Sequence, residues 1–194
     1  IVSTVPGVNF GTSDAFGLAI RHFLAIRGLD QTEIGWLVEG VPAIDPQNYA
    51  PFIETFADTE NISDITIMAG NSRLQDPILN ATGGEYIQSI RNPANEFGGK
   101  VSATVGSFKG RRAFARVDTG QIGKTGLSAY LSGSITRGDP EHGPGRNKRD
   151  HIDFKVRGDW GNDSSSTLFV SYNALSNARV PIPTLAQFNA AKAA

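Results

Sequence analysis

The three histidines are the first residues to consider, because histidine is the commonest metal ligand and proton carrier in proteins. His22, His142 and His151 lack the spacing of a metal-binding segment, and His151 belongs to a stretch in which polar and apolar residues alternate. The chain has no cysteine, which excludes thiolate zinc sites, disulfides and cysteine nucleophiles. We therefore predict no metal site and no cofactor.

Two further patterns suggest enzyme chemistry and are better explained otherwise. Residues 120–125 end like a phosphate-binding loop, but the first glycine that this motif requires would stand at the position of Asp118. Asp58 and Glu60 form a close carboxylate pair in a polar stretch, and a glycosidase would need a cleft that the sequence does not reveal. We therefore predict that the chain is not an enzyme.

Charge is divided unevenly along the chain, although the net charge is only −1. Residues 1–97 carry 4 arginines against 12 acidic residues, a net charge of −8, and residues 98–194 carry 14 basic against 7 acidic residues, a net charge of +7. The division is either a chance distribution of solvated charges or a sign of two parts that complement each other. The basic half forms no compact patch with stacking aromatic residues, so we expect no nucleic-acid partner.

Strict alternation of polar and apolar residues marks the C-terminal half as a set of β-strands. In residues 151–160 the polar positions all carry titratable side chains, while the other positions carry apolar residues or glycine. Turn-forming residues separate such segments from one another. The predicted strands are residues 100–108, 112–118, 126–137, 151–160 and 166–175.

The length of these segments favours strands that cross a membrane. About ten residues at ~3.3 Å each, tilted by ~45°, span roughly 23 Å, which is close to the apolar band of about 25 Å in outer-membrane barrels. A tight turn at 161–164 and a long polar loop at 138–150 fit the same plan. A soluble antiparallel sheet with its apolar face inward would show the same alternation, so both readings stay open here. Five strands cannot close a barrel, so the barrel reading implies a longer protein.

The N-terminal half has shorter apolar runs, separated by turn residues. Residues 61–70 and 85–91 are predicted strands, and residues 52–58 are a candidate short helix. This pattern predicts a small α+β domain.

Five short sequence segments of this half resemble the plug domain of TonB-dependent outer-membrane receptors. They are Val5-Pro6-Gly7-Val8, Ile26-Arg27-Gly28, Val38-Glu39-Gly40-Val41-Pro42, Ile62-Ser63-Asp64-Ile65-Thr66-Ile67-Met68-Ala69-Gly70 and Ala81-Thr82-Gly83-Gly84-Glu85-Tyr86-Ile87. Residues 92–99 resemble the passage from the plug into the first barrel strand. The resemblance implies a small α+β plug domain over 1–97, followed over 98–194 by about five antiparallel transmembrane β-barrel strands of a partial barrel.

The resemblance also implies a function and partners. It implies TonB-dependent active uptake of a scarce ligand, of the siderophore, vitamin or oligosaccharide class, across the bacterial outer membrane. The partners would be TonB, bound through a TonB box that would precede Ile1, outer-membrane lipid, and a small-molecule or oligomeric ligand. The alternative is a soluble, secreted β-rich module that binds a surface or a polymer.

Two departures from the family pattern concern charged residues. Glu39 stands where the family usually has aspartate, and Ala69-Gly70-Asn71 stands where it has Arg-Gly-Pro. In the family that arginine packs against acidic groups of the barrel wall, and Arg73 is the nearby candidate to replace it.

The same resemblance assigns ligand binding to three outward plug loops, at residues 9–19, 29–34 and 43–52. Aromatic residues there would stack on a ligand and polar residues would hydrogen-bond it, with Tyr49 and Asp30 as the preferred candidates. The full set is Phe10, Asp14, Phe16, Asp30, Gln31, Asp45, Gln47, Tyr49 and Phe52.

Basic residues of the second half are expected to meet two different partners. Side chains on the polar faces of the strands should face the acidic N-terminal half, and loop side chains should meet anionic lipid headgroups or water. The first group is Arg112, Arg116, Lys155 and Arg157, and the second is Arg146, Lys148 and Arg149.

Overall fold

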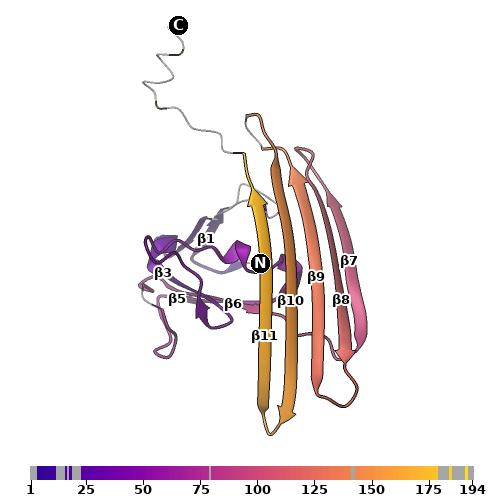
Figure 1. The fold of residues 1–194 in the computed structure, drawn as a ribbon. Helices are drawn as coiled ribbons and strands as arrows, with labels where there is room; N and C mark the ends of the chain where they lie inside the picture. The colour runs from indigo at the N-terminus through magenta and orange to yellow at the C-terminus, as the bar shows by residue number, and fades with distance from the viewer. Residues whose placement is uncertain are drawn as a thin grey trace.

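The structure is a computed structural model that describes residues 4–11, 16, 18, 23–78, 80–140, 143–178, 184 and 191. A sheet of long strands forms one part, and a smaller N-terminal part, made of residues before Phe97, lies against one face of it (Figure 1). No helix among the described residues is long and apolar enough to cross a membrane.

The large sheet contains the five strands that alternation predicts, in the order β11-β10-β9-β8-β7, and all neighbouring pairs are antiparallel. The observed strands reach or pass eight of the ten predicted ends, because ladder hydrogen bonds continue where the alternation of residue types weakens. β7 ends at Val105, three residues earlier than predicted, and β9 begins at Leu127, one residue later. Asn162 and Asp163 have φ of 50° and 58° and form the tight turn between the last two strands. The strands are β7 Phe97–Val105, β8 Arg111–Gln121, β9 Leu127–Gly138, β10 Asn147–Gly161 and β11 Ser164–Ser176.

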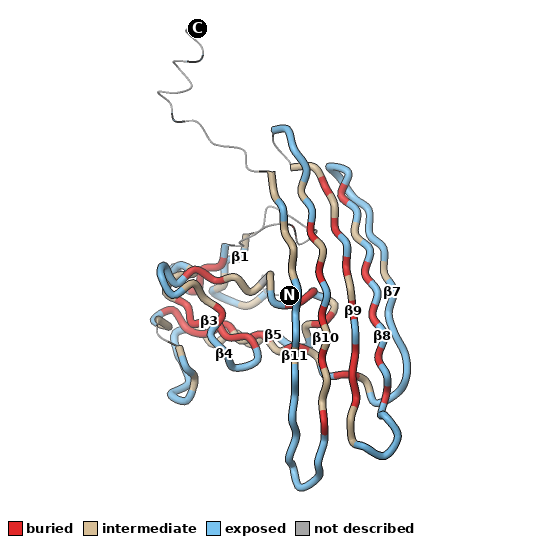
Figure 2. The backbone as a smooth tube through the Cα atoms, in the orientation of Figure 1, coloured by how far each residue is buried: buried red, intermediate tan, exposed pale blue. Residues whose placement is uncertain are grey.

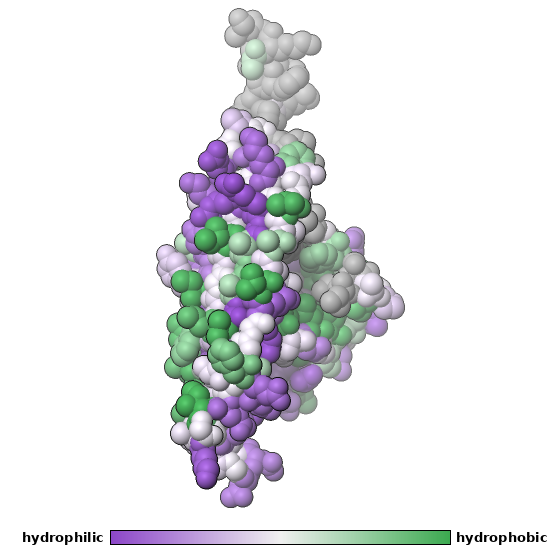
Figure 3. All heavy atoms as spheres, turned by 90° about the vertical axis from the view of Figure 1, so that its right-hand side faces the viewer, coloured by the Kyte–Doolittle hydropathy of each residue, from purple (hydrophilic) through white to green (hydrophobic). Residues whose placement is uncertain are grey.

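The two faces of this sheet differ in chemistry. Buried and exposed residues alternate along β8, β9 and β10 (Figure 2). Most side chains that face the N-terminal part are polar, and Tyr130 among them packs in an apolar cluster with Val38, Ala57 and Ile90. The large apolar side chains that are exposed on the five strands lie on the opposite face (Figure 3). The predicted orientation, with polar faces enclosing the N-terminal half, is therefore confirmed. A soluble sheet would bury its apolar face instead.

One prediction about the basic residues is wrong. Arg149 is only 4% exposed and points inward, so it does not lie among loop residues that could meet lipid headgroups. The reason is that β10 begins at Asn147, four residues earlier than predicted, so Lys148 and Arg149 both belong to the strand and not to the loop. Lys148 is exposed, as expected for either place, and Arg149 points inward.

The N-terminal part is built on a four-stranded mixed sheet in the order β4-β3-β6-β5. β3 runs parallel to β6, and β5 runs antiparallel to β6, which confirms the two strands predicted here. β1 and β2 form a separate antiparallel pair. The bounds are β1 Val8–Gly11, β2 Phe23–Ile26, β3 Ile34–Val38, β4 Val41–Pro42, β5 Ile62–Ala69 and β6 Gly84–Ile90.

Short 3-10 turns connect these strands. They are η2 Gln31–Glu33, η3 Ile53–Thr55 and η4 Thr59–Asn61, so the candidate helix at 52–58 is reduced to one 3-10 turn. The core beneath them is a cluster of Leu24, Ile26, Ile34, Trp36 and Tyr86. Trp36 and Tyr86 stack in a tilted arrangement with ring centroids 4.8 Å apart. This core holds β2, β3 and β6 together and fixes the η2 turn above them.

Candidate functional site

Eight of the nine predicted ligand-binding residues lie in the described part of the structure, and Asp14 lies outside it. They occupy separate segments: β1, the residues just after it, the η2 turn, and the loop that leads to η3. None of the three cavities discussed below is lined by any of the nine. Their role in ligand binding therefore remains a prediction.

Asp30 caps the η2 turn. Its Oδ1 accepts hydrogen bonds from the Thr32 backbone N–H at 2.7 Å and the Thr32 hydroxyl at 2.6 Å, and the Glu33 carboxylate accepts one from the Asp30 backbone N–H. Hydrogen bonds from the Thr32 side chain and then its backbone lower the pKa of the Asp30 carboxyl. Gln31, next in the turn, is partly buried, and its backbone carbonyl accepts a hydrogen bond from the Trp36 indole. Asp30 is exposed, so it presents a negative charge to solvent at neutral pH.

Tyr49 lies in a loop that is tied to itself. Asp45 Oδ1 accepts from the Gln47 backbone N–H at 2.9 Å, and the Tyr49 backbone N–H donates to the Asp45 carbonyl at 2.8 Å. These bonds hold Tyr49 in the left-handed region, at φ 56°, with its side chain 37% exposed. Asp45 thus shapes the loop, while Gln47 and Tyr49 are exposed on it; Phe52 follows, partly buried.

The two remaining aromatic residues differ in their surroundings. Phe10 lies on β1 opposite Leu24 and is 36% exposed. Phe16 packs against the turn between β7 and β8: a Cβ added at Gly106 or at Gly110 would come within 2.6 Å of its ring. For Phe16 the structure therefore shows packing against the large sheet.

The most extensive polar contact is one that sequence reasoning did not assign. The segment from Asp58 through η4 lies against the polar face of the large sheet. Arg112 of β8 forms ion pairs with Asp58 at 2.9 Å and with Glu60 at 2.8 Å. Asp58 is fully buried and also accepts a hydrogen bond from Ser134 at 3.0 Å, with Arg149 at 3.5 Å. The carboxylate pair is thus a docking element and not a pair of catalytic acids.

Asn61 continues this docking segment and is also fully buried. Its side-chain amide donates to Ser132 at 2.7 Å and to Asp153 at 2.8 Å, and its carbonyl oxygen accepts from Arg116 at 3.2 Å. The Asp58 backbone N–H donates to the same Asp153 carboxylate at 3.2 Å. Three strands, β8, β9 and β10, therefore hold one short turn through side-chain hydrogen bonds.

A second contact lies where β6 ends. Lys155, 1% exposed, donates to the Ile90 carbonyl at 2.7 Å and lies 3.4 Å from the Glu39 carboxylate. Glu39 also accepts a hydrogen bond from the Ile90 backbone N–H. Glu39, the residue that replaces the usual aspartate, therefore joins its own turn to both β6 and β10.

In the family an arginine stands at the position of Ala69, and Arg73 does not replace it: no contact of Arg73 with the large sheet is found among the described residues. It is exposed, and its backbone N–H donates to Glu85 within the N-terminal part. Among the described arginines of the N-terminal part, Arg91 approaches an acidic group of the large sheet and lies 3.8 Å from Asp118. Asp118 also accepts a hydrogen bond from the Ala94 backbone N–H at 2.9 Å.

Asp58, His151 and Asp153 form the one group of potential metal ligands found in the described part of the chain, with their ligand atoms within 4.8 Å of one another. His151 is hydrogen-bonded to Asp153 at 2.7 Å, and Arg112 and Arg149 lie beside Asp58. The positive charges of these arginines already balance the carboxylates, and they would repel a cation. We assign the group to the docking network.

Of the four basic residues expected to face the acidic half, three do so by direct contact: Arg112, Arg116 and Lys155. Arg157 instead pairs with Asp159 of its own strand at 2.8 Å. The alternating polar face of the strands identified these basic residues in the sequence, and the closely spaced carboxylates Asp58 and Glu60 were visible there as well. The sequence did not show that the basic residues bind these carboxylates.

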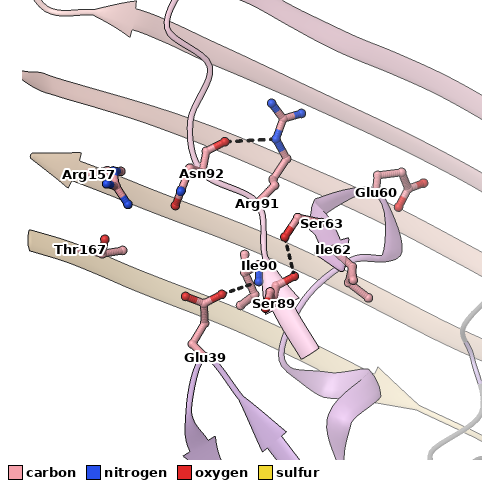
Figure 4. A pocket seen from close by; sticks show the side chains of 10 residues that line it. All are labelled: Glu39, Glu60, Ile62, Ser63, Ser89, Ile90, Arg91, Asn92, Arg157 and Thr167. Atoms are coloured by element: carbon pink, nitrogen blue, oxygen red, sulfur yellow. Dashed lines mark hydrogen bonds between the residues drawn. The ribbon is translucent and has the colours of Figure 1, made fainter. Parts of the chain in front are cut away.

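A cavity of ≈ 650 Å³ lies beside this interface (Figure 4). The N-terminal part contributes most of its lining, including Glu39, Glu60 and Arg91, and β10 and β11 contribute Arg157 and Thr167. The lining is mostly polar, so the space between the two parts suits water or a polar solute.

The pH dependence of docking follows from Glu60. Burial alone would raise the pKa of this carboxyl, but hydrogen bonding and the charge of Arg112 outweigh burial and lower the pKa below the ordinary 4.5. A lowered pKa stabilises the docked state above about pH 4.5, and this stabilisation is lost as pH falls through the lowered value. We expect the hydrogen-exchange protection factors of residues 58–62, taken relative to the intrinsic rate at each pH, to fall in acid.

Glu60→Gln tests this expectation. The protection factors of residues 58–62 should be lower in the variant than in the wild type at pH 7, and they should depend less steeply on pH between 5 and 3. If the protection factors of the two proteins depended equally on pH, Glu60 would not couple docking to pH.

Comparison with known proteins gives the following matches. The family model described as TonB-dependent Receptor Plug Domain matches residues 1–84. No curated protein matches the chain in sequence. Among solved structures, the ferripyoverdine receptor of the outer membrane of Pseudomonas aeruginosa is similar with a TM-score of 0.69 at 15% identity, over 89% of this chain and 22% of that chain.

Two further receptors show the same likeness. The alcaligin outer membrane receptor FauA from Bordetella pertussis has a TM-score of 0.67 at 20% identity, over 90% of this chain and 28% of that one. The ferric yersiniabactin uptake receptor FyuA from Yersinia pestis has a TM-score of 0.63 at 17% identity, over 88% of this chain and 27% of that receptor. At these identities the likeness shows a shared fold, and the chain spans about a quarter of the length of these receptors.

Proposed function

We propose that the chain takes part in TonB-dependent active uptake of a scarce ligand, with a plug gating the lumen of a barrel, because residues 1–84 match the family model of the TonB-dependent Receptor Plug Domain. Receptors with this fold are proteins of the bacterial outer membrane, and the chain is placed there. They are receptors and transporters, not enzymes.

The observation that supports gating is the chemistry of the docked segment. Asp58, Glu60 and Asn61 contact the sheet through ion pairs and hydrogen bonds rather than through apolar packing. Water can replace such bonds when the parts separate, whereas separated apolar surfaces would remain exposed at a high free-energy cost. An apolar cluster of Val38, Ala57 and Ile90 with Tyr130 also joins the two parts, so the polar contacts lower the cost of separation without removing it. A largely polar interface of this kind suits a plug that must shift and then return.

We place the end of the plug at residue 97 and the start of the barrel at residue 98. β7, which begins at Phe97, is the first strand to pair within the large sheet. TonB would act from the periplasm through a TonB box. The ligand would be a ferric siderophore, because the similar receptors are described as binding ferripyoverdine or taking up ferric yersiniabactin.

Uptake in cells tests this function. Cells that express the complete receptor should accumulate radiolabelled iron from ferripyoverdine or ferric alcaligin, and isogenic cells without TonB should not. Equal accumulation with and without TonB would contradict TonB-dependent uptake, and accumulation of vitamin B12 or an oligosaccharide instead of iron would move the ligand to another class.

The predicted ligand residues have a separate test. Replacing both Asp30 and Tyr49 by alanine should weaken binding of the transported ligand by about 10-fold, a loss of about 1.4 kcal/mol. Leu74→Ala is the matched control, because Leu74 is fully exposed on a different loop. Isothermal titration with the purified receptor measures the affinity; unchanged affinity in the double variant would remove both residues from the site.

A further inference from the structure

Three basic residues stand side by side on the outward face of the large sheet. The strand register pairs Arg111 of β8 with Arg137 of β9, and Arg137 with Lys148 of β10. All three belong to the outward-facing set that also contains Ile135 and Ile152. Like charges directly opposite one another destabilise a sheet unless an anion lies near them.

The acidic residues nearby do not balance this row. Arg137 pairs with Asp150 at 2.7 Å, and Lys109 of the adjacent turn pairs with Asp139 at 2.9 Å. Arg111 and Lys148 are exposed, and no ion pair joins either of them to another described residue. A pocket of ≈ 240 Å³ lies at this row, lined by four basic side chains and one acidic one: Lys109, Arg111, Arg137, Arg146 and Asp139.

An apolar groove adjoins the basic row on the same face. Its volume is ≈ 630 Å³, and small residues line it where the register places Ala115 beside Gly133, with Ala113 on the same strand. Larger side chains stand along it, and Arg137 lines both the groove and the basic pocket. In Figure 3 a hydrophilic zone accordingly lies above a hydrophobic band.

We propose that this surface binds one membrane lipid whose headgroup carries a phosphate, with the phosphate at Arg111, Arg137 and Lys148 and an acyl chain in the groove over Ala115 and Gly133. The proposal rests on the outward orientation of the sheet and is independent of the transport ligand. Arginine and lysine bind phosphate through charge-assisted hydrogen bonds.

The position of the surface identifies a lipid rather than a soluble anion. The groove lies on the face turned away from the N-terminal part, among exposed apolar residues such as Ile135, Ile152 and Tyr172, where hydrocarbon surrounds a membrane strand. A free phosphate would use the basic row but not the groove. A lipid uses both, because its charge and its chain are covalently joined.

The test compares phosphatidic acid with diacylglycerol of the same acyl chains, each titrated into the complete receptor in detergent and followed by native mass spectrometry. Arg111→Gln combined with Lys148→Gln should weaken binding of phosphatidic acid by about 30-fold, at about 1 kcal/mol for each basic residue near a membrane surface. Lys124→Gln is the matched control, since Lys124 is exposed in the turn between β8 and β9 at the opposite end of the strands. It should bind like the wild type.

A second variant tests the groove. Gly133→Val fills the groove floor with a residue that suits a strand, and a Cβ at this position has its nearest contact at 3.7 Å, so the sheet should keep its stability. Binding of phosphatidic acid should fall by about 10-fold, and thermal unfolding should be unchanged. The proposal is overturned if diacylglycerol binds as tightly as phosphatidic acid, if glycerol phosphate does so, or if the double variant binds like the wild type.

Discussion

Arg112→Met is expected to destabilise docking of the plug by about 3 kcal/mol, the lower end of the cost of leaving a buried ion pair without one partner. Arg112 is the side chain that pairs with both Asp58 and Glu60, and Asp58 is fully buried. Without the guanidinium, the Asp58 carboxylate keeps two contacts among the residues that the structure describes, Arg149 at 3.5 Å and the hydroxyl of Ser134. Arg149 is the reason that we expect the lower end of the range.

Hydrogen exchange of residues 56–62 in the complete receptor measures this effect, as a protection factor lowered by about 100-fold. Arg157→Met is the control, because Arg157 pairs with Asp159 of its own strand and not with the plug. It should change protection in the segment by less than about 1 kcal/mol. Asp58→Asn combined with Arg112→Met should cost less than the sum of the two single changes, since both remove one shared interaction. Additive effects would refute the pairing.

Gly84→Ala is expected to disrupt the central sheet of the plug, with a loss of about 3 kcal/mol or more. Gly84 begins β6 at φ 122°, and a Cβ there would lie 1.9 Å from the carbonyl oxygen of Met68. Because that oxygen belongs to the backbone of the paired strand β5, no side chain can move aside to make room. The pair β5–β6 must separate or the backbone must change its conformation.

Gly40→Ala is a matched comparison for this change. Gly40 also has a positive φ, 78°, but a Cβ there would meet nothing within 4 Å. It should cost about 1 kcal/mol, the strain of the left-handed conformation alone. Amide exchange in β3 and β5 should increase strongly in Gly84→Ala and slightly in Gly40→Ala. Equal effects would show that crowding at Met68 does not govern this sheet.

The architecture of the barrel strands could be predicted from the sequence because it depends on a local rule. Successive side chains of a strand point to opposite faces, so residues 151–160 reveal two chemically different faces without reference to any partner. Alternation together with the resemblance predicted that Arg112, Arg116, Lys155 and Arg157 face the acidic half. The first three contact it, whereas Arg157 pairs with Asp159 of its own strand. Strand ends were less certain: Arg149 was expected in a loop and lies within β10.

The docking segment could not be predicted in this way, because its partners lie far away in the sequence. Asp58 and Glu60 were visible as a carboxylate pair, but nothing local shows that Arg112, 52 residues after Glu60, binds both. The basic row of Arg111, Arg137 and Lys148 likewise exists only through strand register. The sequence by itself thus determined the strands, their two faces and the division of charge, since each follows from neighbouring residues. Only the tertiary structure decided which charges meet, because ion pairs depend on distances of a few ångströms between segments that folding brings together.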